Sequence, residues 1–307
     1  MPNTPKVSII GSGRVGSTTA LILAMKELAD VTLVDIIEKV PQGEALDIMH
    51  GAASGFGSKV TGTNDFSGIA NSDIVINTAG MARRPGMDRL DLLNRNVQIL
   101  KSVADKIKKY SPETIVLQVS NPMDALNYVM RKATGFPTER VMGMGGMLDS
   151  QRLSLHIANE LNGKPNLIKS MVIGEHGESQ VPLFSQTMFE GKPVGDIINE
   201  QQKEDITKKL RASGSEVIGL KGATIFAPAL AITSMLDNIL NDKKQVMPCS
   251  VHLEGEYGND GIAIGVPARL GRKGVEGVVE LDLNEKEMDM FNASAKKMKS
   301  VIEELKL

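Results

Sequence analysis

A glycine-rich turn between an apolar run and a helix-compatible segment is the feature that most constrains this chain. Lys6 to Ile10 is a short apolar run, Gly11-Ser12-Gly13-Arg14-Val15-Gly16 follows it, and Ser17 to Leu28 suits a helix. A second apolar run, 31–34, ends in Asp35, which completes a β-α-β unit of about 30 residues. This order of strand, turn, helix and strand predicts the start of a parallel sheet.

The same turn predicts a dinucleotide site. Gly11 allows a tight turn, Gly13 lets the backbone approach a pyrophosphate, and Gly16 lets the helix pack on the strand. The helix N-terminus offers free N–H donors and a partial positive charge to phosphates. We therefore expect the whole loop to bind the cofactor, with the members Gly11, Ser12, Gly13, Arg14, Val15 and Gly16.

Asp35 indicates which dinucleotide is bound. Its carboxylate is placed to accept hydrogen bonds from the adenosine ribose hydroxyls, and its charge repels a 2′-phosphate. The sequence therefore favours NAD over NADP. The alternative is an ordinary acid at the end of a strand.

The alternation of strands and helices continues through the first half of the chain. Further strands are expected at 59–63, 73–77, 114–119 and 140–143, with helices at 91–109 and 147–161. This pattern predicts an α/β fold with a Rossmann-type doubly wound parallel sheet in residues 1–145. For residues 146–307 we expect an α+β substrate and catalytic domain. There, helices at 205–219 and 223–240 precede β-branched runs between 246 and 283 that suggest an antiparallel sheet, and Asn284 and Glu287 form a capping box for a last helix.

Composition excludes several classes of partner. The 35 basic and 37 acidic side chains leave a net charge of −2, so no global field attracts nucleic acid or a membrane surface. Cys249 is the single cysteine and is most simply a core residue, and no Cys/His cluster has metal-ligand spacing, so we expect no metal. The N-terminus lacks the apolar core of a signal peptide and the apolar run 223–236 is too short to span a bilayer, which favours a cytoplasmic protein.

An arginine-rich segment follows the apolar run 74–77. Arg83, Arg84 and Arg89 lie close together beside Gly80, Pro85 and Gly86, which suits a hinged lid over a pocket. Guanidinium groups at fixed spacing bind small carboxylate ligands. A solvated basic loop is the alternative.

At these and further points the chain resembles the lactate/malate dehydrogenase family, most closely its lactate-dehydrogenase-like malate dehydrogenases. The matching motifs occur in the family's order and together span roughly 215 residues. The matching segments are 11–16, Asp35, 83–89, Asn94-Arg95-Asn96, Ser120-Asn121-Pro122, Leu148-Asp149-Ser150-Gln151-Arg152, Gly174-Glu175-His176-Gly177 and Lys221-Gly222-Ala223-Thr224.

The resemblance implies that His176 is the acid/base for hydride transfer from a 2-hydroxy acid, a role that suits an imidazole near neutral pH. Asp149 is then expected to orient the imidazole and stabilise its charged form. A structural histidine is the alternative for His176, and His50, His156 and His252 are interpreted as surface or core residues.

The resemblance also implies a substrate and cofactor pocket. Arg152, which shares a helix face with Asp149, would bind the 1-carboxylate, unless the two form only an exposed ion pair. Arg89 would polarise the substrate carbonyl, and Asn121 would contact both substrate and nicotinamide. The remaining expected contacts are Val119 and Asn96 along the cofactor and Thr224 in the pocket wall, where a helix-interior threonine bonded to its own backbone is the alternative.

Arg83 is expected to select the substrate. In the family an arginine at this position goes with malate and a glutamine with lactate; an arginine facing the methyl of pyruvate in a dry pocket would be buried unpaired. Arg84 is expected to face solvent. The resemblance thus implies an NAD-dependent malate dehydrogenase and a homo-oligomer, for which we expect a tetramer, with a homodimer as the alternative. An L-lactate or other 2-hydroxyacid dehydrogenase and a non-catalytic NAD-binding sensor or scaffold are the alternatives.

Overall fold

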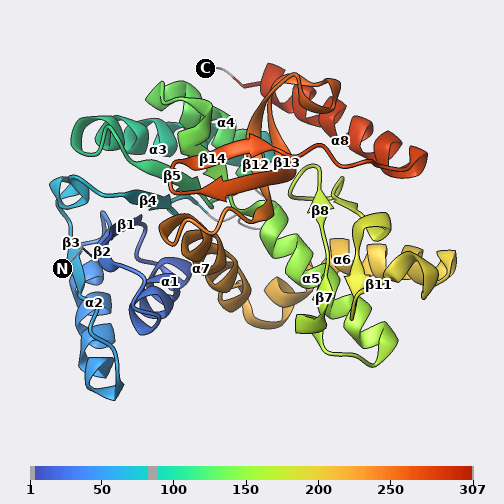
Figure 1. Ribbon diagram of the computed structural model, residues 1–307. Helices are drawn as coiled ribbons and strands as arrows, with labels where there is room; N and C mark the ends of the chain where they lie inside the picture. The colour runs from blue at the N-terminus through green and yellow to red at the C-terminus, as the bar shows by residue number, and fades with distance from the viewer. Residues whose placement is uncertain (1–3, 82–88, 306–307) are drawn as a thin grey trace.

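A nine-stranded sheet forms the centre of the part of the chain that the structure, a computed structural model, describes: residues 4–81 and 89–305, without the side chains of residues 89 and 90. Figure 1 shows the sheet crossing the molecule. In sheet order its strands are β14 (Gly274–Val278), β13 (Asp260–Gly271), β12 (Val246–Glu254), β6 (Val141–Gly143), β5 (Ile115–Gln118), β4 (Ile74–Asn77), β1 (Lys6–Ile10), β2 (Asp30–Val34) and β3 (Val60–Thr63).

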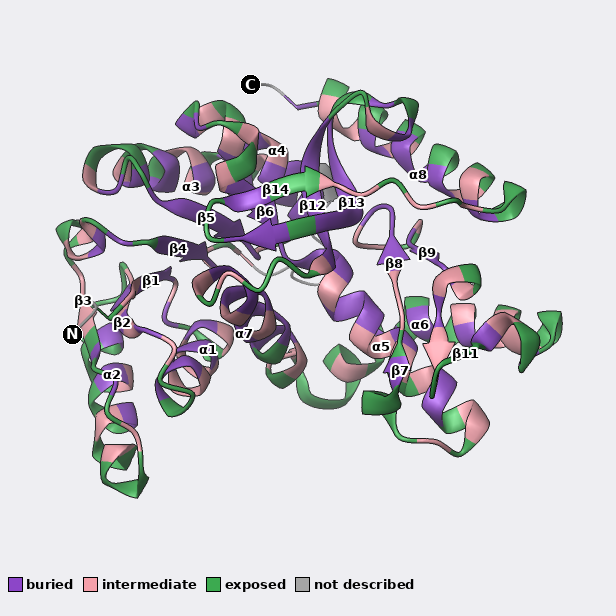
Figure 2. Ribbon diagram, viewed as in Figure 1, coloured by how far each residue is buried: buried purple, intermediate pink, exposed green. Residues whose placement is uncertain are grey.

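The half of the sheet from β6 to β3 is parallel and has the strand order of a dinucleotide-binding fold. The predicted Rossmann-type sheet is therefore confirmed. Strands β4 and β5 are buried along their whole length, and β1 is buried except at its first residue, as the purple strands of Figure 2 show. Burial on both faces is why these strands are unbroken apolar runs in the sequence.

The half from β12 to β14 is antiparallel, as predicted for this region, but it continues the first sheet instead of forming a sheet of its own. The junction is the pairing of Ser250 on β12 with Gly143 on β6. A Cβ on Gly143 would lie 3.0 Å from that of Ser250, and Asn127 Nδ2 donates to the main-chain oxygen of Ser250 at 3.1 Å. Contacts between residues so distant in sequence leave no local pattern.

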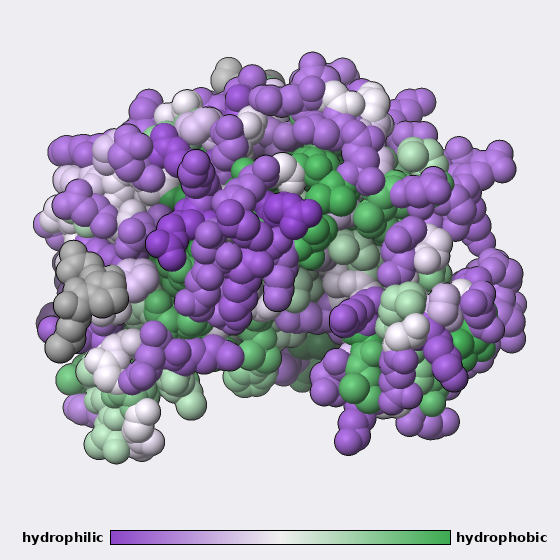
Figure 3. Space-filling view, in the orientation of Figure 1, coloured by the Kyte–Doolittle hydropathy of each residue, from purple (hydrophilic) through white to green (hydrophobic). Residues whose placement is uncertain are grey.

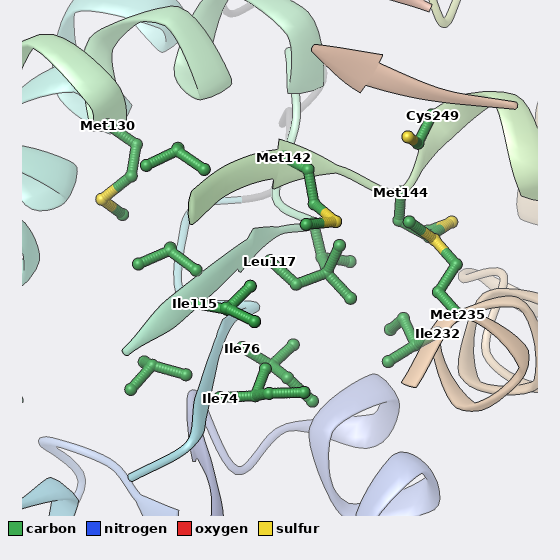
Figure 4. Close-up of a cluster of buried hydrophobic side chains, with 14 of the residues drawn as sticks. Ile74, Ile76, Ile115, Leu117, Met130, Met142, Met144, Ile232, Met235 and Cys249 are labelled. Atoms are coloured by element: carbon green, nitrogen blue, oxygen red, sulfur yellow. The ribbon is translucent and has the colours of Figure 1, made fainter. Parts of the chain in front are cut away.

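Helices cover both faces of the sheet. Figure 1 shows α3, α4 and α8 on one side and α1, α7 and α5 on the other. The close-up in Figure 4 shows the core where Ile76 and Leu117 of the sheet meet Ile232 and Met235 of α7. The helices are α1 (Arg14–Met25), α2 (Val40–His50), α3 (Arg89–Tyr110), α4 (Met123–Thr134), α5 (Gly145–Leu161), α6 (Glu200–Lys221), α7 (Phe226–Leu240) and α8 (Glu285–Glu303).

A second, smaller core lies beside the sheet. Leu153 and Ile157 of α5 pack there with Ile206 and Leu210 of α6. Short strands border it: β7 (Ile168–Lys169), β10 (Met188–Phe189) and β11 (Lys192–Pro193) form one sheet, and β8 (Val172–Ile173) and β9 (Val181–Pro182) another. Single 3-10 turns lie at Gly51–Ser54, Phe66–Ile69, Thr138–Arg140, Pro165–Leu167, Phe184–Gln186, Val194–Asp196 and Glu256–Gly258.

One helix prediction needs correction, and one helix was missed. Helix α7 begins at Phe226 and not at residue 223, because Gly222 at φ +85° ends α6 and the chain turns through 223–225. Thr224 therefore lies in a connection, so the alternative of a helix-interior threonine is wrong. Helix α4 was not predicted, since the preceding Asn121-Pro122 indicates only a turn.

The surface carries no membrane-spanning element in the described part of the chain, where no helix combines the length and apolar character needed to cross a bilayer. The face in Figure 3 is mostly hydrophilic, with hydrophobic side chains gathered in a hollow right of its centre. Cys249 is buried, as predicted, and burial raises the pKa of its thiol to about 12.

The capping box of α8 is confirmed and gives a stability prediction. The Asn284 side chain accepts the main-chain N–H of Glu287 at 2.9 Å. We expect Asn284→Ala to destabilise the protein by about 1 kcal/mol and lower Tm by about 2 °C, measured at one protein concentration. Asn292→Ala, at an exposed interior position of the same helix, is the matched control and should not lower Tm; equal losses in both variants would show that the cap contributes nothing.

Candidate active site

The glycine loop joins the end of β1 to α1 as a tight turn. Gly11 lies at φ +101°, and a Cβ there would sit 2.5 Å from Thr78 Oγ1. A Cβ on Gly16 would lie 2.0 Å from the main-chain oxygen of Gly11, whereas one on exposed Gly13 would meet no atom within 4 Å. The N-terminus of α1 has no side-chain cap. The loop thus has the close packing at Gly11 and Gly16, the open approach at Gly13 and the free N–H donors that bound phosphates require.

Asp35 lies beside this loop at the end of β2. Its Oδ2 accepts the main-chain N–H and the hydroxyl of Ser12, at 2.7 and 3.1 Å, and its Oδ1 accepts the N–H of Ile37 at 3.0 Å. The carboxylate is half-buried and can accept further hydrogen bonds from a ligand. Asp35 therefore lies next to the glycine loop and also stabilises it through its hydrogen bonds to Ser12. Of the other loop residues, Arg14 is exposed and Val15 is half-buried.

Asn96 of α3 connects the neighbouring strand ends. Its Oδ1 accepts the N–H of Met81 at 2.8 Å, and its Nδ2 donates to the main-chain oxygens of Met81 and Asn121 at 3.2 and 2.9 Å. Asn96 and Val119 are both buried, whereas Asn121 is exposed. Asn96 thus holds the base of the arginine-rich segment against the β5–α4 loop, which carries Asn121.

His176, Asp149 and Arg152 meet as the sequence predicted. The imidazole Nδ1 lies 2.6 Å from Asp149 Oδ2, and Asp149 Oδ1 accepts a hydrogen bond from Arg152 Nη1 at 3.1 Å. Helix α5 supplies the acid and the guanidinium, and the loop after β8 supplies the histidine. The Asp149 side chain is only 2% exposed, so this is not the exposed surface ion pair of the alternative.

The electrostatics of this group favour a charged imidazole. Burial by itself lowers the pKa of His176, but the charge and hydrogen bond of Asp149, helped by the charge of Asp124, outweigh it. Arg152 acts in the opposite direction. The net result is a pKa above the usual value for histidine, which suits a group that must both hold and release a proton near neutral pH.

Three residues to which the sequence analysis gave no role in the site lie around His176. Gly145 begins α5, and a Cβ there would lie 2.6 Å from the His176 Cβ, so the imidazole needs a glycine beside it. Asp124 Oδ2 accepts the main-chain N–H of His176 at 2.7 Å. Buried Glu175 accepts from Lys297 Nζ of α8 at 2.6 Å, which ties the histidine loop to the last helix. The acid two residues after Pro122 and the glycine pair at 145–146 were the available sequence signals.

Thr224 carries a further signal of a ligand pocket. Its Oγ1 is buried and has no hydrogen-bond partner among the described residues. A buried hydroxyl without a partner is unfavourable unless a ligand or water satisfies it. Arg83 and Arg84 lie outside the described residues, as does the side chain of Arg89, so their predicted positions are not described.

The other histidines make no hydrogen bond to Asp149, Arg152 or His176 among the described contacts. His50 is exposed, His156 contacts the Ser213 hydroxyl through Nε2 at 2.7 Å, and His252 is buried against Tyr128. Burial lowers the pKa of His252 to about 3. Within residues 4–81 and 89–305, no group of three or more His, Cys, Asp or Glu side chains is arranged to hold a metal ion.

Comparisons with known proteins agree with this geometry. Residues 5–143 match the family model for the NAD binding domain of lactate/malate dehydrogenase, and residues 146–306 match that for its alpha/beta C-terminal domain. Curated relatives named malate dehydrogenase are 41–45% identical to the chain. The one from Methanosarcina mazei is 42% identical over 98% of this chain and 99% of its own.

Solved structures of both activities have the same fold. Malate dehydrogenase from Cryptosporidium parvum has a TM-score of 0.96 and 38% identity, covering 99% of each chain. The lactate dehydrogenase of that organism, complexed with lactic acid and nicotinamide adenine dinucleotide, has a TM-score of 0.94 and 39% identity, covering 99% of this chain and 98% of its own. With both halves matched by its models and full-length relatives above 40% identity, the chain belongs to the lactate/malate dehydrogenase family.

Proposed function

We propose that the protein is an NAD-dependent malate dehydrogenase, which interconverts (S)-malate and NAD with oxaloacetate and NADH. The observation that carries this proposal is the buried group in which Asp149 holds both the His176 imidazole and the Arg152 guanidinium. It unites a proton acceptor with a carboxylate-binding cation. The names of the full-length relatives support the choice of malate.

When bound, NAD would accept the hydride that leaves C2 of malate, and NADH would donate a hydride to the C2 carbonyl carbon of oxaloacetate in the reverse direction. The glycine loop fits its pyrophosphate, because Gly13 opens the backbone and the first turn of α1 has free N–H groups. Asp35 is proposed to accept the ribose hydroxyls. The Asn96 amide is bonded to main-chain groups, so it would support the cofactor site by fixing the main chain of Asn121 and the loop base. Val119 is proposed to line the cofactor.

His176 moves the proton. As malate is oxidised, the imidazole takes the hydroxyl proton while the C2–H bond gives its electron pair with the hydrogen as hydride, leaving a C2 carbonyl. With Nδ1 held by Asp149, Nε2 is the nitrogen that is free to face the substrate. In the reverse direction the protonated imidazole returns the proton to the carbonyl oxygen. Asp149 fixes the ring and stabilises its positive charge.

Arginines are proposed to bind the two carboxylates of the substrate. Arg152 uses Nη1 toward Asp149 and has further donors for the 1-carboxylate. The exposed Asn121 amide and the unpartnered hydroxyl of Thr224 are proposed to complete the pocket wall. From the arginine-rich segment, Arg83 is proposed to pair with the 4-carboxylate and Arg89 to polarise the carbonyl. Closing that segment would exclude water from the hydride path.

An L-lactate or other 2-hydroxyacid dehydrogenase is the alternative within the family, since a lactate dehydrogenase has the same fold at 39% identity. A non-catalytic NAD-binding sensor is the alternative from another class; it needs the glycine loop but not the buried His176, Asp149 and Arg152. Steady-state oxidation of NADH with oxaloacetate and pyruvate side by side distinguishes the three. A preference for oxaloacetate supports malate dehydrogenase, a preference for pyruvate a lactate dehydrogenase, and no turnover a sensor.

The proposed assembly is a homotetramer in the cytoplasm, with a homodimer as the alternative. Exposed apolar side chains support self-association. They lie just before α2 and within it, and near the turn between α6 and α7: Ile36, Ile37, Leu46, Leu220 and Phe226.

The glycine loop gives a prediction for cofactor binding. Gly16→Ala places a Cβ against the backbone of Gly11 and should weaken NADH binding by about tenfold or more, measured by fluorescence titration. Gly43→Ala is the matched control, because Gly43 is exposed in α2 with no atom within 4 Å of an added Cβ. Unchanged affinity in Gly16→Ala would contradict the assigned nucleotide site.

Arg83 gives a prediction for specificity. Arg83→Gln should lower kcat/KM for oxaloacetate by about 10³-fold and raise the relative value for pyruvate, because the 4-carboxylate loses its charged partner. Arg84→Gln, in the same segment, should leave the ratio of the two values unchanged. If Arg83→Gln also leaves that ratio unchanged, Arg83 does not select the substrate.

His176 gives a prediction that separates binding from chemistry. His176→Asn should lower kcat by about 10²–10⁴-fold because it removes the acid/base, with NADH affinity unchanged. His50→Asn, at an exposed position, should keep full activity. Full turnover by His176→Asn would place the acid/base elsewhere.

A further inference from the structure

A second buried acid, Asp124, contacts the histidine residue on its main chain. Its Oδ2 accepts the N–H of His176 at 2.7 Å, whereas Asp149 bonds the imidazole of the same residue. The Asp124 side chain is buried, and besides the His176 N–H it has only the Ser250 hydroxyl as a hydrogen-bonding neighbour among the described residues. A buried carboxylate with so few donors is unfavourable, so a role beyond simple packing is expected.

Helix capping does not explain this acid. Asp124 is the second residue of α4, where a carboxylate often bonds the helix's own N–H groups. The N-cap of α4 is Pro122, and the helix has no side-chain cap. Instead, the Asp124 carboxylate bonds the main chain of a residue 52 positions further along. The contact therefore joins α4, which follows the Asn121 loop, to the histidine loop.

The charges around this contact come from several elements. Asp149 and Arg152 of α5 flank the imidazole. A cavity of about 290 Å³ borders Asp124 and His176, and its other charged neighbours are Glu175 of the histidine loop with Lys297 and Glu304 of α8. Burial raises the pKa of Asp124 to about 6, while the Ser250 hydroxyl of β12 and the N–H and charge of His176 act against the rise.

We propose that Asp124 is a positioning residue for the reaction: it fixes the main chain of His176 and, by its negative charge, stabilises the protonated imidazole. This rests on the proposed function in assigning the proton transfer to His176. Asp149 holds the imidazole ring through Nδ1, and Asp124 holds the main chain of the same residue. Both acids favour the imidazolium, against the opposing charge of Arg152.

The charge and the position can be separated by two variants. Asp124→Asn keeps an oxygen that can accept the His176 N–H but removes the charge, so the pKa of His176 should fall by about one unit. Asp124→Ala removes both and should also lower kcat by about tenfold or more, with NADH affinity unchanged. Glu287→Gln is the matched control, because Glu287 is a buried acid that bonds Ser185 away from the histidine.

The measurement is an NMR titration of the ¹³C-labelled imidazoles in the free protein, with the His176 signal assigned by its loss in His176→Asn. A fall in the His176 pKa in Asp124→Asn, absent in Glu287→Gln, supports the proposal. In activity, Asp124→Asn should then lose oxaloacetate reduction at pH 8, where reduction needs the protonated ring, by about tenfold relative to wild type. An unchanged His176 pKa in Asp124→Asn overturns the proposal.

A reciprocal titration covers the case in which Asp124→Asn does not fold. In His176→Asn the Asp124 carboxyl loses a neighbouring positive charge, so it should titrate at higher pH than in wild type. An unchanged Asp124 titration overturns the proposal. Both titrations use the free protein, so they decide the influence of Asp124 even if wild type fails to reduce oxaloacetate, a result that would overturn the proposed function separately.

Discussion

The hydrogen bond between His176 and Asp149 is the interaction on which the rest of the site depends. At 2.6 Å and almost wholly buried, it fixes the tautomer and orientation of the ring and links it to the guanidinium of Arg152. Transfer of a carboxylate from water to the protein interior is unfavourable, so the fold must supply hydrogen-bond partners for both oxygens of Asp149. That requirement explains why α5 presents Asp149 and Arg152 on one face. The glycine at 145 has a different reason, because a Cβ there would clash with the His176 side chain.

The continuous sheet brings the two halves of the site together. The glycine loop, Asp35 and the Asn121 loop follow the parallel strands, whereas His176 follows β8 in the second half of the chain. The pairing of β6 with β12 and the Asp124 bond to His176 join these parts. Helix α8 adds a third attachment through Lys297 and Glu175. A hydride acceptor bound by the glycine loop of the first half would thus share one site with the His176 imidazole of the second.

Local sequence signals predicted the features that depend on local physics. The glycine spacing, the apolar parallel strands and the Asn284 capping box all appear where expected, and the family resemblance brought together Asp149, Arg152 and His176. Contacts made at long range were missed: the β6–β12 junction, Asp124 and Gly145. The start of α7 was predicted three residues too early, which placed Thr224 in a helix. The apolar run that begins at residue 223 gave no sign that the turn at Gly222 extends to residue 225. The domain boundary at residue 145 and the roles of the arginine-rich segment stay predictions.

The central claim is that the imidazole held by Asp149 transfers the proton while Arg152 holds the substrate. A crystal structure of the protein with NAD and oxaloacetate tests it most directly. The account predicts His176 Nε2 within about 3.2 Å of the C2 oxygen and the 1-carboxylate paired with Arg152. A complex in which the imidazole lies out of reach of that oxygen, or the 1-carboxylate is held by another cation, would contradict it.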